Sequence, residues 1–296
     1  MPVRDAASPP SDPMALIDIH PHVVSTDTER FPLAPIGGRQ SDWSQQRPVT
    51  YEQMIEAMDG AGIAKSAVVQ ASSAYAFDNS YVAAAVAAFP KRFTGVFSVD
   101  VLAHDAVDAM KYWISKGLTG LRLYTAGTSL PEQTTWFADP KTFPAWDFAG
   151  EAEIPVCMQM RHKGFAQLEP MLRRFPKVRF IIDHLARTEM ADGPPYAAAA
   201  PLFGLARHPN VYLKVTHRNF EEARNGRSTP EAFFGALVKE FGAERIAWGS
   251  NFPAARQKLP ELVALGRESL AFLPQQDRDW IFEKTALTLY PALTNK

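Results

Sequence analysis

The stretch Leu16-Ile17-Asp18-Ile19-His20-Pro21-His22 joins an apolar strand to two imidazoles at its end. In an extended strand, side chains at positions i and i+2 point to the same face, so His20 and His22 are predicted to project together. Such a pair suits either one metal ion or one anionic substrate. The alternative is that the two histidines only form hydrogen bonds within a loop. The residues further along the chain distinguish between these two interpretations.

Downstream of this stretch, apolar runs alternate with helical patterns. The later strands are predicted at 65–70, 93–100, 118–124, 155–160, 178–184, 211–216 and 246–250. Helices are predicted at 51–60, 79–89, 106–116, 143–153, 165–175, 196–207, 230–241, 259–270 and 275–286. Thr50 is the expected N-cap of the first helix, which a glycine is expected to close.

The strand runs are continuously apolar, as expected when both faces of a strand are buried. Strict alternation of strands and helices over this length predicts an α/β fold, a (β/α)₈ TIM barrel, as a single domain with a C-terminal helical extension. A doubly wound sheet is the alternative, but no Gly-x-Gly-x-x-Gly follows an early strand. We expect residues 1–14 to form a flexible N-terminal arm and residues 15–292 to form the barrel.

The composition of the chain limits the classes of partner that it is expected to bind. The 296 residues carry a formal net charge of -1, which gives no electrostatic case for binding nucleic acid or a membrane surface. No stretch approaches the roughly 20 apolar residues of a membrane helix. The single cysteine, Cys157, excludes an internal disulfide and favours a cytoplasmic location. Cys157 sits in an apolar run, where core packing is favoured over a nucleophilic role. A small-molecule partner is therefore expected, with a homodimer possible through the C-terminal helices.

Polar side chains stand at the predicted carboxyl ends of the strands, where barrel enzymes place their chemistry. Four of them are arginines, whose planar forks suit carboxylates. Together with a tyrosine they form the predicted substrate-binding set, namely Arg122, Tyr124, Arg161, Arg187 and Arg218. A neutral ligand would not require so many guanidinium groups, so we expect a small anionic, carboxylate-bearing substrate. Pairing of single arginines with rim carboxylates is the alternative. Trp43 and Trp136 lie in long loops that are candidates to close over the substrate.

A second set of strand-end residues consists of imidazoles and one amide. His20 and His22 follow the first strand, His184 follows the sixth and Asn251 follows the eighth. In a barrel these ends meet near the axis, so the four side chains are the predicted catalytic set. They could surround either a metal ion or a water molecule.

Three motifs in this order resemble the amidohydrolase superfamily. They are Asp18-Ile19-His20-Pro21-His22, Ile182-Asp183-His184-Leu185-Ala186-Arg187 and Trp248-Gly249-Ser250-Asn251-Phe252-Pro253. The resemblance spans the whole predicted barrel and is strongest to the amidohydrolase-related branch, in particular to pyrone-dicarboxylate lactonases and sugar lactonases.

This resemblance implies that His20, His22 and His184 are candidate ligands of one divalent metal, zinc being the expected ion. It also places Asn251 where most relatives carry an aspartate that takes a proton from the attacking water. A histidine or lysine is usual on strand five, where this chain has Gln159. Some lactone-acting members of the branch are understood to work without a metal, so metal-free operation is the alternative.

Asn251 bears directly on the mechanism, because a neutral amide cannot act as a general base. Three explanations stay open: an engineered substitution, chemistry that does not need the aspartate, or a different base such as His184 or His217. The sequence predicts a hydrolase that opens a small carboxylated lactone. The alternatives are a metal-independent lactone isomerase, an aromatic-acid decarboxylase, and a catalytically inactive carboxylate-binding protein. The isomerase is supported by a resemblance, because a lactone isomerase similar to this group also carries Asn at the end of strand eight.

Overall fold

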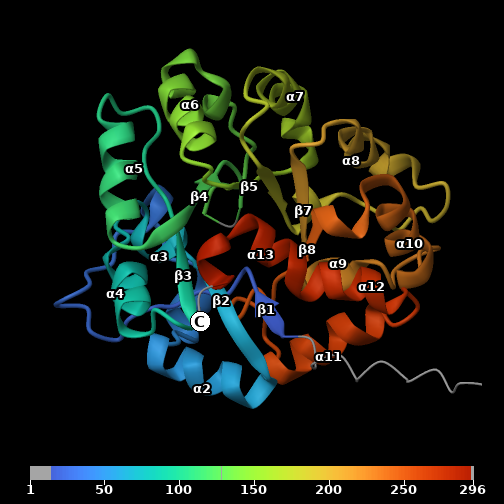
Figure 1. Cartoon of the computed structure of the whole chain (residues 1–296), viewed down its shortest axis with the longest axis horizontal. Helices are drawn as coiled ribbons and strands as arrows, with labels where there is room; N and C mark the ends of the chain where they lie inside the picture. The colour runs from blue at the N-terminus through green and yellow to red at the C-terminus, as the bar shows by residue number, and fades with distance from the viewer. Residues whose placement is uncertain (1–14, 128, 295–296) are drawn as a thin grey trace, which may run out of the picture.

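The computed structural model describes residues 15–127 and 129–294. Its centre is one eight-stranded parallel sheet with strand order β1 to β8 (Figure 1). The last strand returns to the first, where the backbone N–H of Ile19 donates to the carbonyl of Trp248 at 3.3 Å. The predicted (β/α)₈ barrel is therefore confirmed. Within the described residues, no helix combines the length and the apolar character needed to cross a membrane.

The strands are short and lie close to their predicted positions. They are β1 (Leu16–Asp18), β2 (Ile63–Val69), β3 (Phe93–Phe97), β4 (Leu118–Tyr124), β5 (Val156–Gln159), β6 (Phe180–Asp183), β7 (Val211–Val215) and β8 (Ile246–Trp248). Their register places Asp183 beside Lys214, and Tyr124 beside Gln159. Polar side chains of neighbouring strands thus meet at the same carboxyl end of the barrel.

Helices surround the barrel on the outside (Figure 1). The longer ones are α2 (Tyr51–Ala61), α4 (Ser80–Ala88), α5 (Ala106–Ser115), α6 (Phe143–Glu151), α7 (Phe165–Arg174), α10 (Pro230–Phe241) and α11 (Leu259–Ser269). Shorter ones are α1 (Asp42–Gln46), α3 (Ser72–Tyr75), α8 (Ala200–Gly204), α9 (His217–Glu222), α12 (Gln275–Asp279) and α13 (Thr285–Leu289).

Local chemistry explains where α2 begins and ends. The Thr50 side chain accepts from the backbone of Gln53, and the Gln53 side chain accepts from the backbone of Thr50, which forms a capping box. Gly62, with φ of 69°, ends the helix in the left-handed conformation. The sequence interpretation had the helix close at Gly60, which instead lies inside it.

Two predicted helices are interrupted. The segment predicted at 196–207 divides into η6 (Ala197–Ala199), α8 and η7 (Leu205–Arg207). The segment predicted at 275–286 divides into α12, the π-helical η9 (Trp280–Lys284) and α13. The short helices α1, α3 and α9 were not predicted, because four to six residues carry too little periodicity to identify a helix.

The C-terminal segment covers one end of the barrel, where α13 crosses the opening (Figure 1). Leu289, Tyr290 and Leu293 pack in a buried cluster with inward-facing strand residues such as Ile17 and Val69. The ammonium of Lys65 on β2 donates to the carbonyl of Leu293 at 2.6 Å. The predicted C-terminal extension therefore closes the barrel opposite the strand ends that carry the chemistry.

Candidate active site

A cavity opens at the carboxyl ends of the strands. Its empty volume, including the mouth that opens to solvent, is about 590 Å³. The residues that line it are His22, Trp43, Ala71, Ser72, Ser73, Arg122, Tyr124, Gly127, Gln159, His184, Arg187, Arg218, Asn251 and Ala254. We call this the inner cavity. It joins predicted residues from both sets, the imidazoles with Asn251 and the arginines with Tyr124.

Asp18 ties the first strand to the last beneath this cavity. Its Oδ1 accepts from the backbone N–H groups of His20 at 2.9 Å and Ser250 at 2.8 Å. Burial raises the pKa of this carboxyl, while the hydrogen bonds from Ser250 and His20 act in the opposite direction. A methyl group at Gly249 would lie 2.6 Å from Cβ of His20, so glycine is needed where the two strand ends approach.

The three predicted imidazoles lie together. The ring of His20 is centred 4.8 Å from that of His22 and 4.7 Å from that of His184. His22 also stacks on Trp43, with centroids 5.2 Å apart and an interplanar angle of 27°. Trp43, predicted in a loop but found in α1, thus contributes a wall of the inner cavity, and its closure over a substrate stays a prediction. The other loop tryptophan, Trp136, is absent from the described residues that line this cavity.

Hydrogen bonds fix which nitrogen of each ring carries the proton. The ammonium of Lys214 can only donate, so Nδ1 of His20, 3.0 Å from Nζ, accepts and Nε2 carries the hydrogen. That Nε2 is buried without a partner among the described residues. Nδ1 of His22 lies 2.8 Å from the carbonyl of Val69 and must donate to it, which leaves Nε2 of His22 with its lone pair.

His184 is held by the start of α9. Its Nδ1 lies 2.8 Å from the hydroxyl of Thr216, which in turn donates to Oδ1 of Asn219 at 3.5 Å. The amide of Asn219 donates back to the carbonyl of His184 at 3.0 Å. This network assigns the proton of His184 to Nδ1 and the lone pair to Nε2.

Burial keeps all three rings neutral. Burial first, then the Arg122 guanidinium, lowers the pKa of His22 to about 3. Burial also lowers the pKa of His20 well below its usual range, with Lys214 as the next cause, and it lowers that of His184 in the same direction. Two of these uncharged imidazoles, His22 and His184, line the inner cavity and form its floor, while His20 is fully buried behind them.

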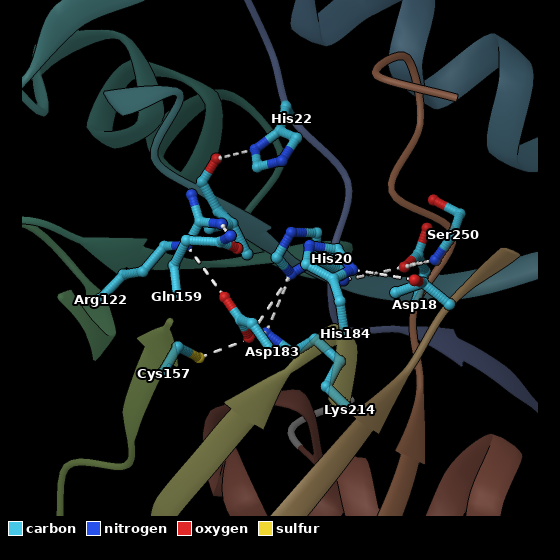
Figure 2. Close-up of polar contacts among 12 residues, drawn as sticks. Asp18, His20, His22, Arg122, Cys157, Gln159, Asp183, His184, Lys214 and Ser250 are labelled. Atoms are coloured by element: carbon cyan, nitrogen blue, oxygen red, sulfur yellow. Dashed lines mark hydrogen bonds and ion pairs between the residues drawn. The ribbon is translucent and has the colours of Figure 1, made fainter. Parts of the chain in front are cut away.

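A buried charge network supports this floor (Figure 2). Asp183 pairs with the ammonium of Lys214 at 2.8 Å and with Nε of Arg122 at 3.0 Å, while Arg122 also donates to Oε1 of Gln159 at 3.0 Å. Burial would raise the pKa of Asp183, but the two cations outweigh it and hold that pKa at about 2. The network itself holds two cations and one anion, and Arg122 is its member that lines the cavity.

Cys157 belongs to the same network. Its thiol lies 3.3 Å from Nζ of Lys214 and 3.4 Å from the hydroxyl of Tyr290, and it is fully buried. Burial raises the pKa of this thiol, which disfavours the thiolate that a nucleophile requires. The structure thus gives Cys157 a packing and hydrogen-bonding position in the barrel interior.

The segment η5 (His184–Arg187) is a left-handed turn. Its four residues have φ values between 51° and 53°, although none is glycine. Each left-handed non-glycine residue costs on the order of 1–2 kcal/mol. Residues three positions apart in a helical turn share a face, and His184 and Arg187 both line the inner cavity. Strain in this turn therefore brings an imidazole and a guanidinium to one wall.

The predicted arginines occupy two different places. Arg122, Arg187 and Arg218 line the inner cavity, whereas Arg161 lies beyond it, in a neighbouring cavity that Arg187 also borders. The guanidinium groups of Arg161, Arg187 and Arg218 make no hydrogen bond or ion pair with any described residue. Burial, then Arg218 and Arg161, lowers the pKa of Arg187. Glu222 lies close enough to Arg187 to favour its charge, but it forms no ion pair with it.

Asn251 lines the cavity in a left-handed backbone conformation, with φ of 58°. Asn and Asp tolerate this conformation better than other non-glycine residues. His217, the other predicted candidate base, does not appear among the described residues that line the inner cavity. Its Nδ1 lies 3.3 Å from the carbonyl of Ser250, and burial followed by Arg218 lowers its pKa to about 4.

Sequence reasoning gave no role to several residues that build the site. Asp18, Asp183 and Lys214 are fully buried titratable residues, and Ser72 and Ser73 line the cavity from α3. A signal for Asp18 and Lys214 exists in the sequence, because each is the one charged residue of its apolar run. The serines carry no such signal, because serine is common in loops of every kind.

The surroundings of the three imidazoles are unfavourable for the predicted zinc ion. Nowhere in residues 15–127 and 129–294 are three or more His, Cys, Asp or Glu side chains arranged to hold a metal ion. The Lys214 ammonium occupies Nδ1 of His20 and places a positive charge beside it. Amides stand at Gln159 and Asn251, which are poorer ligands than imidazoles or carboxylates. Metal ligation by His20, His22 and His184 stays a prediction.

The fold and the site together define a class: a (β/α)₈ barrel whose carboxyl-end cavity combines neutral imidazoles with guanidinium groups, two of which form no ion pair with the described residues. Residues 17–292 match the family described as Amidohydrolase, and the chain belongs to that family. The resemblance read from the three motifs is thereby confirmed.

Among curated proteins, the chain is similar to L-fucono-1,5-lactonase of Burkholderia ambifaria. The two are 32% identical over 124 residues, which are 41% of this chain and 42% of the lactonase. The match thus spans less than half the length of that relative.

Solved structures share the fold. A probable 2-pyrone-4,6-dicarboxylic acid hydrolase of Acinetobacter baumannii with bound citric acid has a TM-score of 0.72 at 18% identity, covering 94% of this chain and 100% of the other. An amidohydrolase of Burkholderia multivorans with bound zinc has a TM-score of 0.74 at 16% identity, covering 94% and 99%.

Proposed function

We propose that the protein is a hydrolase that opens a small carboxylated lactone. The observation that carries this proposal is the opposition, in one cavity, of neutral imidazoles on the floor and unpaired guanidinium groups on the wall. An anionic substrate supplies the acceptors that Arg187 and Arg218 lack. The partial match to L-fucono-1,5-lactonase supports opening of a lactone ring, and the fold is shared with a probable 2-pyrone-4,6-dicarboxylic acid hydrolase.

In the proposed mechanism, arginines anchor the substrate carboxylate and orient the lactone carbonyl toward the floor. His20 is fully buried and lies behind the residues that line the inner cavity, and its Nε2–H has no partner among the described residues. In the proposal this N–H donates to the carbonyl oxygen of a lactone seated at the bottom of the cavity. The net positive charge of Lys214 and Arg122 over Asp183 stabilises the negative charge that develops on this oxygen.

The nucleophile is a water molecule whose oxygen attacks the carbonyl carbon. Its proton passes to an imidazole lone pair, for which Nε2 of His184 and Nε2 of His22 are the two available positions in the cavity wall. The same imidazole returns the proton to the ring oxygen when the C–O bond breaks, and a hydroxy acid leaves. Asn251 orients the water through its amide.

A lactone isomerase is a second candidate. Asn251 favours it because a neutral amide cannot act as a general base, which leaves the imidazoles of the cavity to take the proton. An imidazole with a strongly lowered pKa is a weak base toward water. A hydroxyl of the substrate itself is held beside the carbonyl and gains a large effective concentration, which offsets a weak base. Attack by that hydroxyl exchanges one lactone ring for another with no water consumed.

We propose further that the reaction does not need a divalent metal. The support is the hydrogen bond from Lys214 to Nδ1 of His20 and the absence, in the described part of the chain, of three converging metal ligands. Assay of purified protein after chelation, with metal analysis of the same sample, tests this point. Activity that disappears on chelation and returns with zinc would contradict it.

The decisive experiment follows a panel of carboxylated lactones by proton release and by ¹H NMR. Hydrolysis at neutral pH releases one proton for each ring opened, whereas isomerisation changes the ring without releasing a proton. Neutral lactones of the same ring size serve as controls and should react poorly. Release of CO₂ from aromatic acids would support a decarboxylase instead. Binding of carboxylates without turnover of any lactone would identify an inactive binding protein.

A further inference from the structure

A second cavity lies beside the inner one, between the loop after β4 and the ends of β5 and β6. Its empty volume, including its opening to solvent, is about 1320 Å³. Its wall includes Glu132, Gln133, Arg161, Lys163, Gln167 and Arg187. We call this the outer cavity. Arg187 lines both cavities, so the two cavities adjoin at this side chain.

The wall of the outer cavity is fixed around Arg161. Oε1 of Gln133 accepts the backbone N–H of Arg161 at 2.7 Å, and Nε2 of Gln133 donates to the hydroxyl of Thr125 at 2.9 Å. A methyl group at Gly164 would lie 2.9 Å from Cδ of Gln133, so glycine leaves room for this side chain. The backbone of Arg161 is thus held in place.

Side chains in this wall lack partners. Nε of Arg161, Nε of Arg187 and Oε1 of Gln167 are buried atoms without a hydrogen-bond partner among the described residues. Buried polar atoms in folded proteins are normally paired, and unpaired ones lose the hydrogen bond they made to water. Three such atoms around one cavity indicate a surface built to receive polar groups from a ligand.

The charge of the wall indicates what those groups are. Three cations, Arg161, Lys163 and Arg187, face two carboxylates, Glu132 and Glu189, and none of the five forms an ion pair within the described chain. Arg161 and Arg187 line the same wall, and the pKa of Arg187 is lowered by burial first, then by Arg218 and then by Arg161. A carboxylate between them relieves their repulsion and accepts from both planar forks.

We propose that the outer cavity is a subsite for a second carboxylate of the substrate, carried on a substituent that extends past Arg187 and bound by Arg161. This inference rests on the proposed function only in taking the substrate to be a lactone. It makes the substrate an elongated dianion whose two carboxylates occupy different cavities, and it assigns Arg161 to the selection of substrate length.

Unbranched dicarboxylates of increasing length, from succinate to sebacate, provide the test when titrated calorimetrically into the protein. Affinity should rise once the chain spans both cavities. Arg161→Met should weaken the long dicarboxylates by about tenfold or more, the effect of losing a hydrogen-bonded charge pair, and leave succinate unchanged. Arg161→Lys keeps the charge without the planar fork, so its affinity for the long dicarboxylates should lie between the affinities of the unaltered protein and of Arg161→Met. Arg173→Met, at an exposed arginine of α7 that pairs with Glu169, is the matched control and should change nothing.

Affinity independent of length, or an equal loss for all lengths in Arg161→Met, would overturn the proposal. Loss of binding together with a lowered melting temperature in both Arg161 variants would do the same, because it would give Arg161 a structural role. Failure of the proposed function is separable: if no lactone is turned over but the length dependence persists and requires Arg161, the subsite stands and the reaction does not.

Discussion

Nζ of Lys214 on β7 lies 3.0 Å from Nδ1 of His20, which follows β1, in the fully buried interior of the barrel. A lysine ammonium has no acceptor, so this contact determines that His20 carries its proton on Nε2. The lysine therefore converts a histidine of the metal-ligand type into a hydrogen-bond donor.

Replacement of Lys214 by Met removes the donor to Nδ1 of His20, so the proton of this ring should no longer be confined to Nε2. Because the proposed carbonyl donor is then lost, we expect kcat to fall by about 10²-fold or more, as for other donors to a developing oxyanion. We also expect a loss of stability of about 3–5 kcal/mol, since Asp183 loses one of its two cations. Kinetics and ¹⁵N NMR of the histidine rings measure the two effects separately. Lys111→Met, at an exposed lysine, is the control, and an unaltered His20 tautomer in Lys214→Met would refute the assignment.

Asn251→Asp should increase hydrolysis. The backbone at this position has φ of 58°, which aspartate tolerates as well as asparagine does, so the fold should be kept. A carboxylate beside the nucleophile adds a general base, an effect on the order of 10²–10⁴-fold in suitable geometry. The ratio of proton release to isomerised product should rise in the variant. An unchanged ratio would show that the base already present is sufficient.

Gly127→Ala should disturb substrate binding without touching a charged group. A methyl group at this position would lie 1.9 Å from the hydroxyl of Tyr124, so the ring must leave its place in the cavity wall. We expect KM to rise with a smaller change in kcat. Gly60→Ala is the matched control, since a methyl there meets nothing within 4 Å and lies inside α2. This control should gain about 0.5–1 kcal/mol of stability and keep its KM.

His217 should contribute to the loss of stability in acid. Its pKa is about 4 in the folded protein and near 6.5 when unfolded, so below pH 6.5 the unfolded chain binds a proton that the folded chain does not. Stability present above pH 6.5 is therefore lost as the pH falls toward 4, by up to about 3 kcal/mol. His217→Gln should lose less stability than the unaltered protein between pH 7 and pH 4.5 in urea unfolding. Parallel curves for the two proteins would contradict this expectation.

Ala186→Gly probes the left-handed turn. Ala186 has φ of 52° and Ala149 lies inside α6, and both are fully buried, so each substitution removes the same methyl group. Glycine is favoured in the left-handed conformation and disfavoured within a helix. We therefore expect Ala186→Gly to destabilise the protein by about 1–2 kcal/mol less than Ala149→Gly. Equal losses in urea unfolding would show that the turn carries no strain.

The sequence came closest to the structure where a pattern repeats. Eight apolar runs separated by helical patterns leave few architectures in which both faces of every strand are buried, and the barrel is the one that forms. The pattern was less informative at 196–207, where two short 3₁₀ segments interrupt the helix. Hydrophobic periodicity does not distinguish a continuous helix from adjacent short ones.

Within the site, the sequence placed His22, His184, Asn251, Arg122 and Arg187 at strand ends, and the barrel brings them to one cavity. It grouped Arg161 with the other arginines, whereas the structure separates it, because strand-end position fixes the rim of a barrel but not the direction of a side chain beyond the strand.

What the residues alone determined is thus the barrel, the end that carries the chemistry, and the kinds of group found there, since all three follow from periodicity and from the shared direction of parallel strands. Only the tertiary structure decided the state of those groups. The proton on Nε2 of His20 and the neutral imidazoles depend on burial and on Lys214, a residue 194 positions away along the chain. Desolvation and contacts between distant residues exist only once the barrel has closed.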